Sequence, residues 1–233
     1  MNWKEIKVSS DNTYFTFDDQ PIFSQTFDEV LKFHEPGLAP VIDQTGAYHI
    51  NIHGEPIYPE RYQRTFGYYY KRAAVISSQG WFHINEVGKS IYTHHYAWVG
   101  NYQDELCTVS DNQNNYFHIK LNGDRIYSEN YIYAGDFKDR VACVKSHDGF
   151  YRHIDCFGKL LHNQEFVDLG VFHKGFATAK DRTGWFHINR NGRAIYSDRY
   201  LAVEPFYNGF AVVTLFNHEK IIINEKGRKI IEV

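Results

Sequence analysis

The sequence has few of the residues that mark several classes of protein. Only 3 of its 233 residues are cysteine, and no Cys-x-x-Cys pair occurs, so it predicts neither a disulfide framework nor a structural zinc site. Cys107, Cys143 and Cys156 are expected to be reduced thiols of a cytosolic protein. The 6 prolines and the lack of a Ser- or Gly-rich linker mark no domain boundary, and residues 1–233 are expected to form a single domain.

Excess charge of one sign and long apolar runs are also absent. The formal net charge of −3 provides no electrostatic basis for binding nucleic acid or an anionic membrane, and neither is expected as a partner. No apolar run approaches the roughly 20 residues of a membrane-spanning helix. The segment Met1–Glu5 begins no apolar signal sequence. We therefore expect a soluble, cytoplasmic protein.

What the sequence does contain is a histidine-centred repeat. Successive copies align with steps of 34, 35, 35, 34 and 35 residues on His49, His83, His118, His153, His187 and Ile222. A fixed period of this size is typical of repeat architectures. Residues 1–46 are interpreted as a degenerate first repeat, with Tyr14 in the histidine position and Asp19 in place of a turn glycine.

Each unit has a pattern typical of β-structure. The segment Trp185–Asn189 alternates between two faces, and a turn with Gly192 and a short strand ending in Ile195-Tyr196 follow it. A third strand is expected over 200–206 and a fourth over 210–214. The sequence thus predicts an all-β fold of six to seven four-stranded meanders. We expect a β-propeller-like toroid, with an open β-solenoid as the alternative.

From Ala47 to Val233 these units resemble the WG-containing repeats of bacteria. The matching places are Trp185, Ile188, Gly192, Ile195, Tyr200, Gly209, Ala211 and Val213. The chain departs from the usual pattern where Phe82 and Phe186 replace the glycine after tryptophan and where histidine replaces the next aromatic residue. The resemblance implies a repeat fold. Similar repeats precede methyltransferase domains in some bacterial proteins, which implies a role in recruiting substrates for such an enzyme.

No motif predicts catalysis, a cofactor or a metal site. The equivalent histidines lie on different units, too far apart to share an ion, and are expected to be half-buried packing residues with one satisfied nitrogen. The pairs His94–His95 and His49–His53 lack the geometry of metal ligands on one helix face. Serines and carboxylates fall in turns without a nucleophile motif, so we expect no enzyme.

Aromatic residues at one turn suggest a binding surface. Tyr69, Tyr70, Lys71 and Arg72 replace the polar turn found at 207–209, and Trp98 occupies a variable strand position. Tyrosine and tryptophan are common anchors of interfaces. The leading hypothesis is a monomeric, non-enzymatic scaffold that binds a protein or peptide at this turn. The alternatives are a carbohydrate- or small-ligand-binding module and a substrate-recruiting accessory of a methyltransferase-type enzyme.

Overall fold

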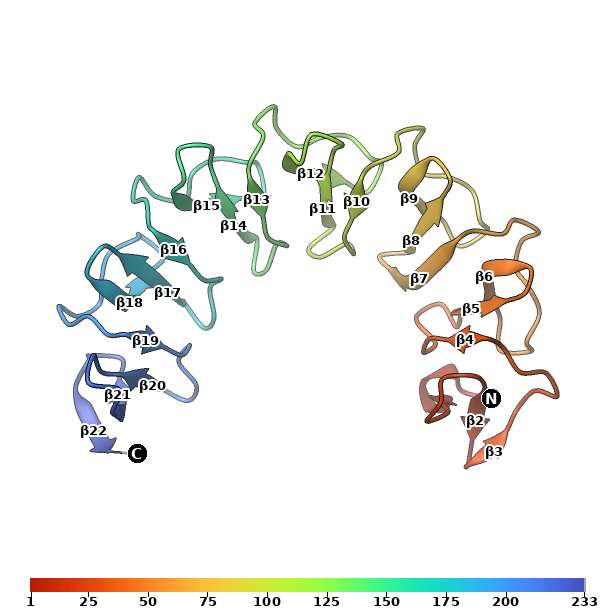
Figure 1. Ribbon diagram of the computed structural model, residues 1–233, viewed down its shortest axis with the longest axis horizontal. Coiled ribbons are helices and arrows are strands. Elements are labelled where there is room, and N and C mark those ends of the chain that lie inside the picture. The colour runs from red at the N-terminus through yellow and green to blue at the C-terminus, as the bar shows by residue number, and fades with distance from the viewer. Residues whose placement is uncertain (233) are drawn as a thin grey trace. The chain divides into compact units, whose positions relative to one another are not determined.

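The computed structural model describes residues 1–232, and within them the regular secondary structure is almost entirely β (Figure 1). The one helical element among these residues is a three-residue 3-10 helix, η1 (Trp3–Glu5). The strands are β1 (Lys7–Val8), β2 (Phe15–Phe17), β3 (Gln20–Pro21), β4 (Glu29–Val30), β5 (Ala39–Asp43), β6 (Gly46–Ile50), β7 (Arg64–Tyr69), β8 (Arg72–Ser77), β9 (Gly80–Ile84), β10 (Trp98–Val99), β11 (Leu106–Ser110), β12 (Tyr116–Lys120), β13 (Tyr133–Ala134), β14 (Val141–Lys145), β15 (Tyr151–Asp155), β16 (Asp168–Leu169), β17 (Phe176–Asp181), β18 (Gly184–Asn189), β19 (Ala202–Val203), β20 (Phe210–Thr214), β21 (Lys220–Asn224) and β22 (Lys229–Glu232).

These strands form seven sheets, and neighbouring strands in a sheet are also neighbours in the chain. Six sheets have three strands, namely β1–β2–β3, β4–β5–β6, β7–β8–β9, β10–β11–β12, β13–β14–β15 and β16–β17–β18. The seventh, β19–β20–β21–β22, has four. The prediction of an all-β, propeller-like repeat is therefore confirmed, and the described residues contain seven repeats, one for each sheet.

The chain divides into two compact units. The first contains residues 1–114 and 118–125, and the second contains residues 115–117 and the described residues from 126 onward. The first unit has a core that includes Phe15, Val41 and Ile84, and the second has cores around Phe172 and Phe206. That the whole chain is one domain stays a prediction. No helix of the described residues is long and apolar enough to span a membrane.

The third strand of most sheets is the segment that the repeat pattern predicts, and it is covered on both faces. In β18, Phe186 and Ile188 lie on one face and His187 on the other, yet all three are buried. Alternation of a polar and an apolar residue usually indicates a half-exposed strand. Here the histidine face is buried too, so the prediction of half-buried histidines is wrong and they belong to the interior.

The predicted strand that ends in Ile-Tyr is shorter than expected. In the five middle repeats it is reduced to isolated bridges such as Ile84 to Ser90 and Ile188 to Ala194. Among the described residues it forms a strand in the first sheet, as β3, and in the last sheet, as β22. The reason lies in the tyrosine that follows. The chain leaves the sheet edge after one bridge and brings the Tyr92 hydroxyl inward, 2.6 Å from Nδ1 of His83.

Each buried histidine links three parts of the fold. In the His83 repeat, Nδ1 faces the Tyr92 hydroxyl of the following loop, and Nε2 lies 3.0 Å from the carbonyl oxygen of Gly100, beside β10 of the next sheet. Because a carbonyl only accepts, Nε2 carries the proton and Nδ1 accepts from the tyrosine. His49 and His187 make the equivalent pair of contacts. Both nitrogens are satisfied, not one as expected.

The turn glycines explain why successive units fit together. Gly158 has a φ of +81°, as a tight hairpin requires, and a Cβ there would lie 2.2 Å from the Tyr127 ring of the preceding repeat. Gly88 meets Tyr58 in the same way. The glycine is therefore needed for its backbone conformation and also for the close approach of the preceding tyrosine.

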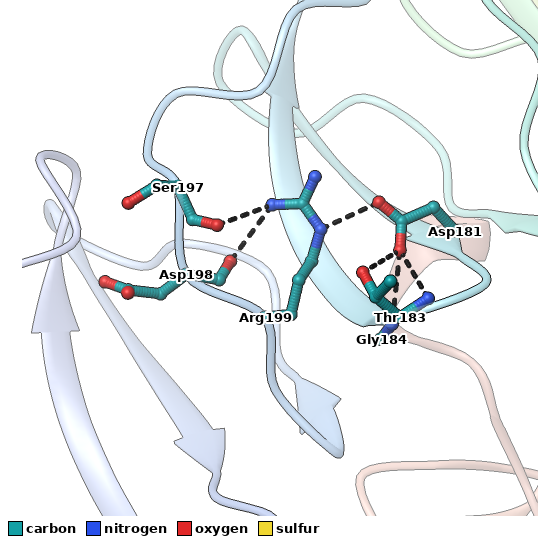
Figure 2. Close-up of polar contacts among 6 residues, drawn as sticks. All are labelled: Asp181, Thr183, Gly184, Ser197, Asp198 and Arg199. Carbon is teal, nitrogen blue, oxygen red and sulfur yellow. Dashed lines mark hydrogen bonds and ion pairs between the residues drawn. The ribbon is translucent and has the colours of Figure 1, made fainter.

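An arginine anchors the loop that leads into the last sheet (Figure 2). Nε of Arg199 donates to Asp181 at 2.8 Å, and Nη1 donates to the carbonyl oxygens of Ser197 and Asp198. The guanidinium also lies 3.6 Å from the centre of the Phe186 ring. These interactions, together with the hydrogen bonds of Thr183 to Asp181, hold the pKa of that carboxyl at about 2 although partial burial opposes this. The polar groups of this cluster form hydrogen bonds with one another, so we regard the cluster as structural.

Candidate functional site

The site is a pocket of about 450 Å3 at three neighbouring turns of the first compact unit. Each turn joins the first two strands of its sheet, and we call it the first turn of that sheet. The contributing turns are β4–β5, β7–β8 and β10–β11. The pocket is lined by His34, Glu35, Tyr68, Tyr69, Tyr70, Lys71, Tyr102 and Gln103. Four of these eight side chains are tyrosines.

The floor of the pocket is built from the fold itself. Tyr68 and Tyr102 are almost completely buried, and their rings pack against the imidazoles of His49 and His83 at centroid distances of 4.7 and 4.8 Å. The hydroxyl of Tyr68 donates to the carbonyl of Asn85, and Tyr102 makes the equivalent bond further along the chain. Burial raises the pKa of both phenols, so they are neutral donors.

The rim is formed by the first turn of the β7–β8 pair. Tyr70 and Lys71 have φ values of +48° and +62°, and Tyr70 is 47% exposed. Tyr69 packs on the imidazole of His34 with a centroid distance of 5.1 Å. Arg72 lies behind the turn and donates from Nη1 to the Tyr70 carbonyl and from Nε to that of Leu121. The arginine thus fixes the turn and leaves the tyrosines on the surface.

The charges around the pocket are few and of both signs. Burial and the neighbouring Lys32 lower the pKa of His34, so its imidazole is neutral at pH 7. No ion pair between described residues involves Glu35 or Lys71. The pocket therefore offers one unpaired carboxylate, one unpaired ammonium group and several neutral polar groups above an aromatic floor.

The same backbone turn recurs with other side chains. A pair of residues with positive φ follows the first strand at Tyr70–Lys71, Asp104–Glu105, Asp139–Arg140, Lys174–Gly175 and Asn208–Gly209. Two successive residues of this kind are typical of the tight hairpin that matches the twist of a sheet. The fold requires the turn, but it does not require tyrosine there.

The structure brings together three of the five residues predicted to bind a partner. Tyr69, Tyr70 and Lys71 line the pocket, whereas Arg72 lies behind it. Trp98 is not among the lining residues. It is the first residue of β10, pairs with Ser110 across the sheet and is 38% exposed. That any of the five binds a partner stays a prediction.

The other five lining residues were not predicted, although the repeat period contained a signal for four of them. His34 lies 35 residues before Tyr69 and Gln103 lies 34 residues after it, so the three occupy one repeat position. Tyr68 and Tyr102 share the preceding position. Extending the repeat alignment from the histidines to the turns would have placed these residues on adjacent units.

No group of three or more His, Cys, Asp or Glu side chains in residues 1–232 is arranged to hold a metal ion. Both ring nitrogens of His49, His83, His153 and His187 are in hydrogen bonds, and burial lowers the pKa of these four imidazoles to about 4. Neutral imidazoles with both nitrogens in hydrogen bonds have no lone pair left for a metal.

No family model matches this chain, and no curated protein matches it. Among solved structures it is similar to a crystal structure of a eukaryotic initiation factor, at 10% identity over 91% of this chain and 66% of that chain, with a TM-score of 0.57. BamB from Moraxella catarrhalis has 10% identity, coverages of 95% and 76% and a TM-score of 0.49. The C-terminal WD40 domain of Sif2 has 9% identity, coverages of 91% and 71% and a TM-score of 0.42. At such identities the likeness concerns the fold alone.

Proposed function

We propose that this protein is a non-enzymatic repeat scaffold that binds a protein or peptide partner at the pocket formed by Tyr69, Tyr70, Lys71 and the two adjacent first turns. The proposal rests on one observation above all. Tyr70 and Lys71 occupy a turn whose positive φ disfavours bulky side chains.

A bulky residue with positive φ is strained, by an amount of about 1 kcal/mol or more. Tyr70 at φ +48° and Lys71 at +62° therefore both carry this cost, whereas Asn208–Gly209 makes an equivalent turn with residues that suit it. Tyr70 is 47% exposed, so burial of its side chain offsets little of this strain. Strain of this kind supports a role in binding.

The experiment exchanges the turn without removing it. The double variant Tyr70→Asn/Lys71→Gly gives the β7–β8 hairpin the residues that its conformation favours, so we expect a fold that is at least as stable as the parent. A library of random displayed peptides is selected on the parent chain, and the selected peptides are then tested on the variant. We expect their affinity to fall at least tenfold, because two rim side chains are removed.

Tyr207→Ser serves as the matched control, since Tyr207 occupies the position equivalent to Tyr69 in a different sheet. It should leave peptide binding unchanged. The proposal is wrong if the library yields no binder, or if peptides bind the turn variant as tightly as the parent.

A second candidate is a carbohydrate- or small-ligand-binding module. The observation that favours it is the pocket volume of about 450 Å3, which lies in the range of small-molecule sites. A thermal-shift screen of neutral oligosaccharides and small metabolites tests it, with the turn variant as reference. Stabilisation of the parent alone by such a compound, with no peptide binder, would favour this candidate. The accessory role beside a methyltransferase stays a prediction from the resemblance to WG-containing repeats.

A further inference from the structure

The imidazole of His34 occupies a slot in the neighbouring sheet, at one side of the pocket. The slot lies beside Gly67, a buried residue of β7 within the bulge between Thr65 and Tyr68. A Cβ on Gly67 would collide with Nε2, Cδ2 and Cε1 of the His34 ring, the farthest of them at 2.7 Å. The φ of Gly67 lies outside the left-handed region, so its backbone does not require glycine. Glycine is needed here because the imidazole comes so close.

The glycine slot is specific to this pair of sheets, whereas the contact between histidine and tyrosine rings is not. The residues at the position of Gly67 in the other repeats are Lys32, Asn101, Asp136, Val171 and Pro205. His173, which is equivalent to His34, packs on Tyr207 with 5.0 Å between ring centroids. Pro205 stands in the place of the glycine there, and Nε2 of His173 is buried without a hydrogen-bond partner among residues 1–232. A histidine on the turn therefore does not by itself produce the seat that His34 has.

Seated in the glycine slot, His34 connects two of the turns that line the pocket. It belongs to the β4–β5 turn, and it contacts Gly67 and the ring of Tyr69, which lead into the β7–β8 turn. The bulge itself is fixed from the core, because Nε2 of His49 donates to the carbonyl oxygen of Phe66 at 2.8 Å. The position of Tyr69 at the rim therefore depends on whether the His34 ring stays in the slot.

We propose that His34 is a positioning residue of the pocket: as a neutral ring in the glycine slot it holds Tyr69 where a partner binds, and a proton on the ring unseats it. The pocket then binds its partner at neutral pH and releases it in mild acid. The inference rests on the proposed function, because it concerns the regulation of that same site.

Few charged groups lie around the His34 ring. Lys32 and Glu35 are exposed neighbours on the same turn, and Lys71 lines the pocket from the β7–β8 turn. The other titratable side chains near the ring carry almost no charge between pH 5 and 7.5, namely His49 and the phenols of Tyr68, Tyr69, Tyr70 and Tyr102. Among these groups, His34 is the one that titrates in this range.

Protonation unseats the ring for electrostatic reasons. Burial in the slot, together with the neighbouring Lys32, lowers the pKa of His34, and a hydrogen bond with the backbone of Tyr68 opposes this shift without cancelling it. Because the seated ring has the lower pKa, a proton favours the unseated state, in which the exposed Glu35 can accept from the imidazolium. Partner binding is therefore complete above the ordinary pKa of 6.5 and is lost as the pH falls below it.

The test is the pH dependence of peptide affinity, measured on the full chain between pH 7.5 and 5. The probe is a peptide selected on the parent chain at pH 7.5 from a displayed library without Asp, Glu or His, so the probe does not titrate in this range. We expect the affinity to fall by up to about tenfold for each pH unit below the pKa of the free imidazole, because one proton is taken up. Circular dichroism checks at each pH that the protein is folded.

Two variants separate the positioning role from a general effect of acid. His34→Gln keeps a hydrogen-bond donor but takes up no proton, so its affinity should not change with pH. Gly67→Ala fills the slot, so it should bind at pH 7.5 about as weakly as the parent does at pH 5. His173→Gln is the matched control, since His173 makes the same ring contact without a glycine slot, and it should keep the affinity and the pH dependence of the parent.

NMR of the His34 imidazole provides a second readout that a merely structural role would not move. Linkage is reciprocal, so a peptide that binds the seated state must lower the pKa of His34 further. An imidazole pKa that is the same with and without peptide would contradict the inference.

The outcomes also separate this inference from the function on which it rests. Equal parent affinity at pH 7.5 and 5, or a pH dependence that persists in His34→Gln, shows that the inference is wrong and that the peptide-binding function stands. A folded Gly67→Ala variant with the affinity of the parent leads to the same conclusion. If Gly67→Ala does not fold, His34→Gln and the imidazole pKa decide. If no peptide binds the parent at pH 7.5, both are wrong.

Discussion

Mild acid should destabilise this protein through its interior histidines. His49 and His83 lie in the first compact unit, and His153 and His187 in the second. Burial lowers the pKa of each to about 4, from an ordinary value of 6.5. The perturbation is a change of pH from 7.5 to 5, a range in which an unfolded chain protonates these groups and the folded protein does not.

The sign follows from which state binds the proton more tightly. The unfolded state does so, because the folded pKa is the lower one, so protonation favours unfolding. The stabilisation is complete above pH 6.5 and is lost as the pH falls toward 4. With a shift of about 2.5 pKa units, each histidine should lose about 2 kcal/mol by pH 5 and about 3.4 kcal/mol at the acid limit. Two histidines per unit give about 4 kcal/mol at pH 5.

The assay is urea unfolding at several pH values between 7.5 and 5, followed by circular dichroism and by tryptophan fluorescence. Carboxylates interfere little, because their unfolded pKa lies near 3.8 and the shifts at Asp148 and Asp181 act below that value. The variant His187→Gln should be less stable at pH 7.5, but the second unit should then take up about one proton on unfolding instead of two. His53→Gln, at an exposed position, is the control and should leave the slope unchanged.

Two results would refute the reasoning. One is an unfolding free energy that stays constant between pH 7.5 and 5. The other is an imidazole of the folded protein, observed by NMR at His49 or His187, that titrates near 6.5. Either would mean that these rings are solvated or that their hydrogen bonds rearrange to accept the proton.

Three further changes test the packing. Gly158→Ala should cost about 3 kcal/mol, because its Cβ would lie 2.2 Å from a tyrosine ring. Gly149 has a similar φ of +87° but open space around it, so Gly149→Ala should cost only about 1 kcal/mol. Thermal unfolding compares the two variants. Arg199→Lys should lower the free energy of unfolding by about 1 kcal/mol, because an ammonium group cannot bond Asp181 and the two loop carbonyls at once as the guanidinium does. An unchanged free energy in urea unfolding would contradict this. His162→Tyr should raise the free energy of unfolding by about 1 kcal/mol near pH 5. The change removes a buried Nδ1 without a partner and introduces the tyrosine hydroxyl that other repeats have at this position. A free energy of unfolding below that of the parent would show that the imidazole is needed.

The fold could be predicted from sequence largely because its determinants recur. Ile84, Ile154 and Ile188 are completely buried at one repeat position, and the turn glycines have the positive φ that the spacing indicates. The full burial of His83 and its second hydrogen bond could not be predicted, because the partner is a backbone carbonyl 17 residues further on. Every residue has a backbone carbonyl, so the sequence does not indicate which one accepts this bond. The assignment to WG-containing repeats stays a prediction.

The pocket was predicted only in part, for a related reason. Tyr70 is conspicuous in the sequence because tyrosine rarely occupies a turn. Its neighbours are not, since His34 and Gln103 are ordinary turn residues taken one at a time. Their proximity depends on the packing of one sheet beside the next, and Tyr102 joins the pocket although it is completely buried. Trp98 was predicted together with this turn but does not line the pocket, and that it binds a partner stays a prediction.

The repeats themselves separate the positions that build the fold from those that are free to serve another purpose. The interior histidine recurs in five copies with little change, and the position beneath the pocket is always tyrosine or phenylalanine, as at Tyr102 and Phe172. The very next position holds His34, Tyr69, Gln103, Lys138, His173 and Tyr207 in successive units. The last five of these precede the same two-residue turn with positive φ, whereas His34 precedes a turn with a cis Glu35–Pro36 bond, so the shared turn does not select among those five side chains. The side chains at this position are therefore free to suit a ligand, and in the first compact unit His34, Tyr69 and Gln103 lie above an aromatic floor.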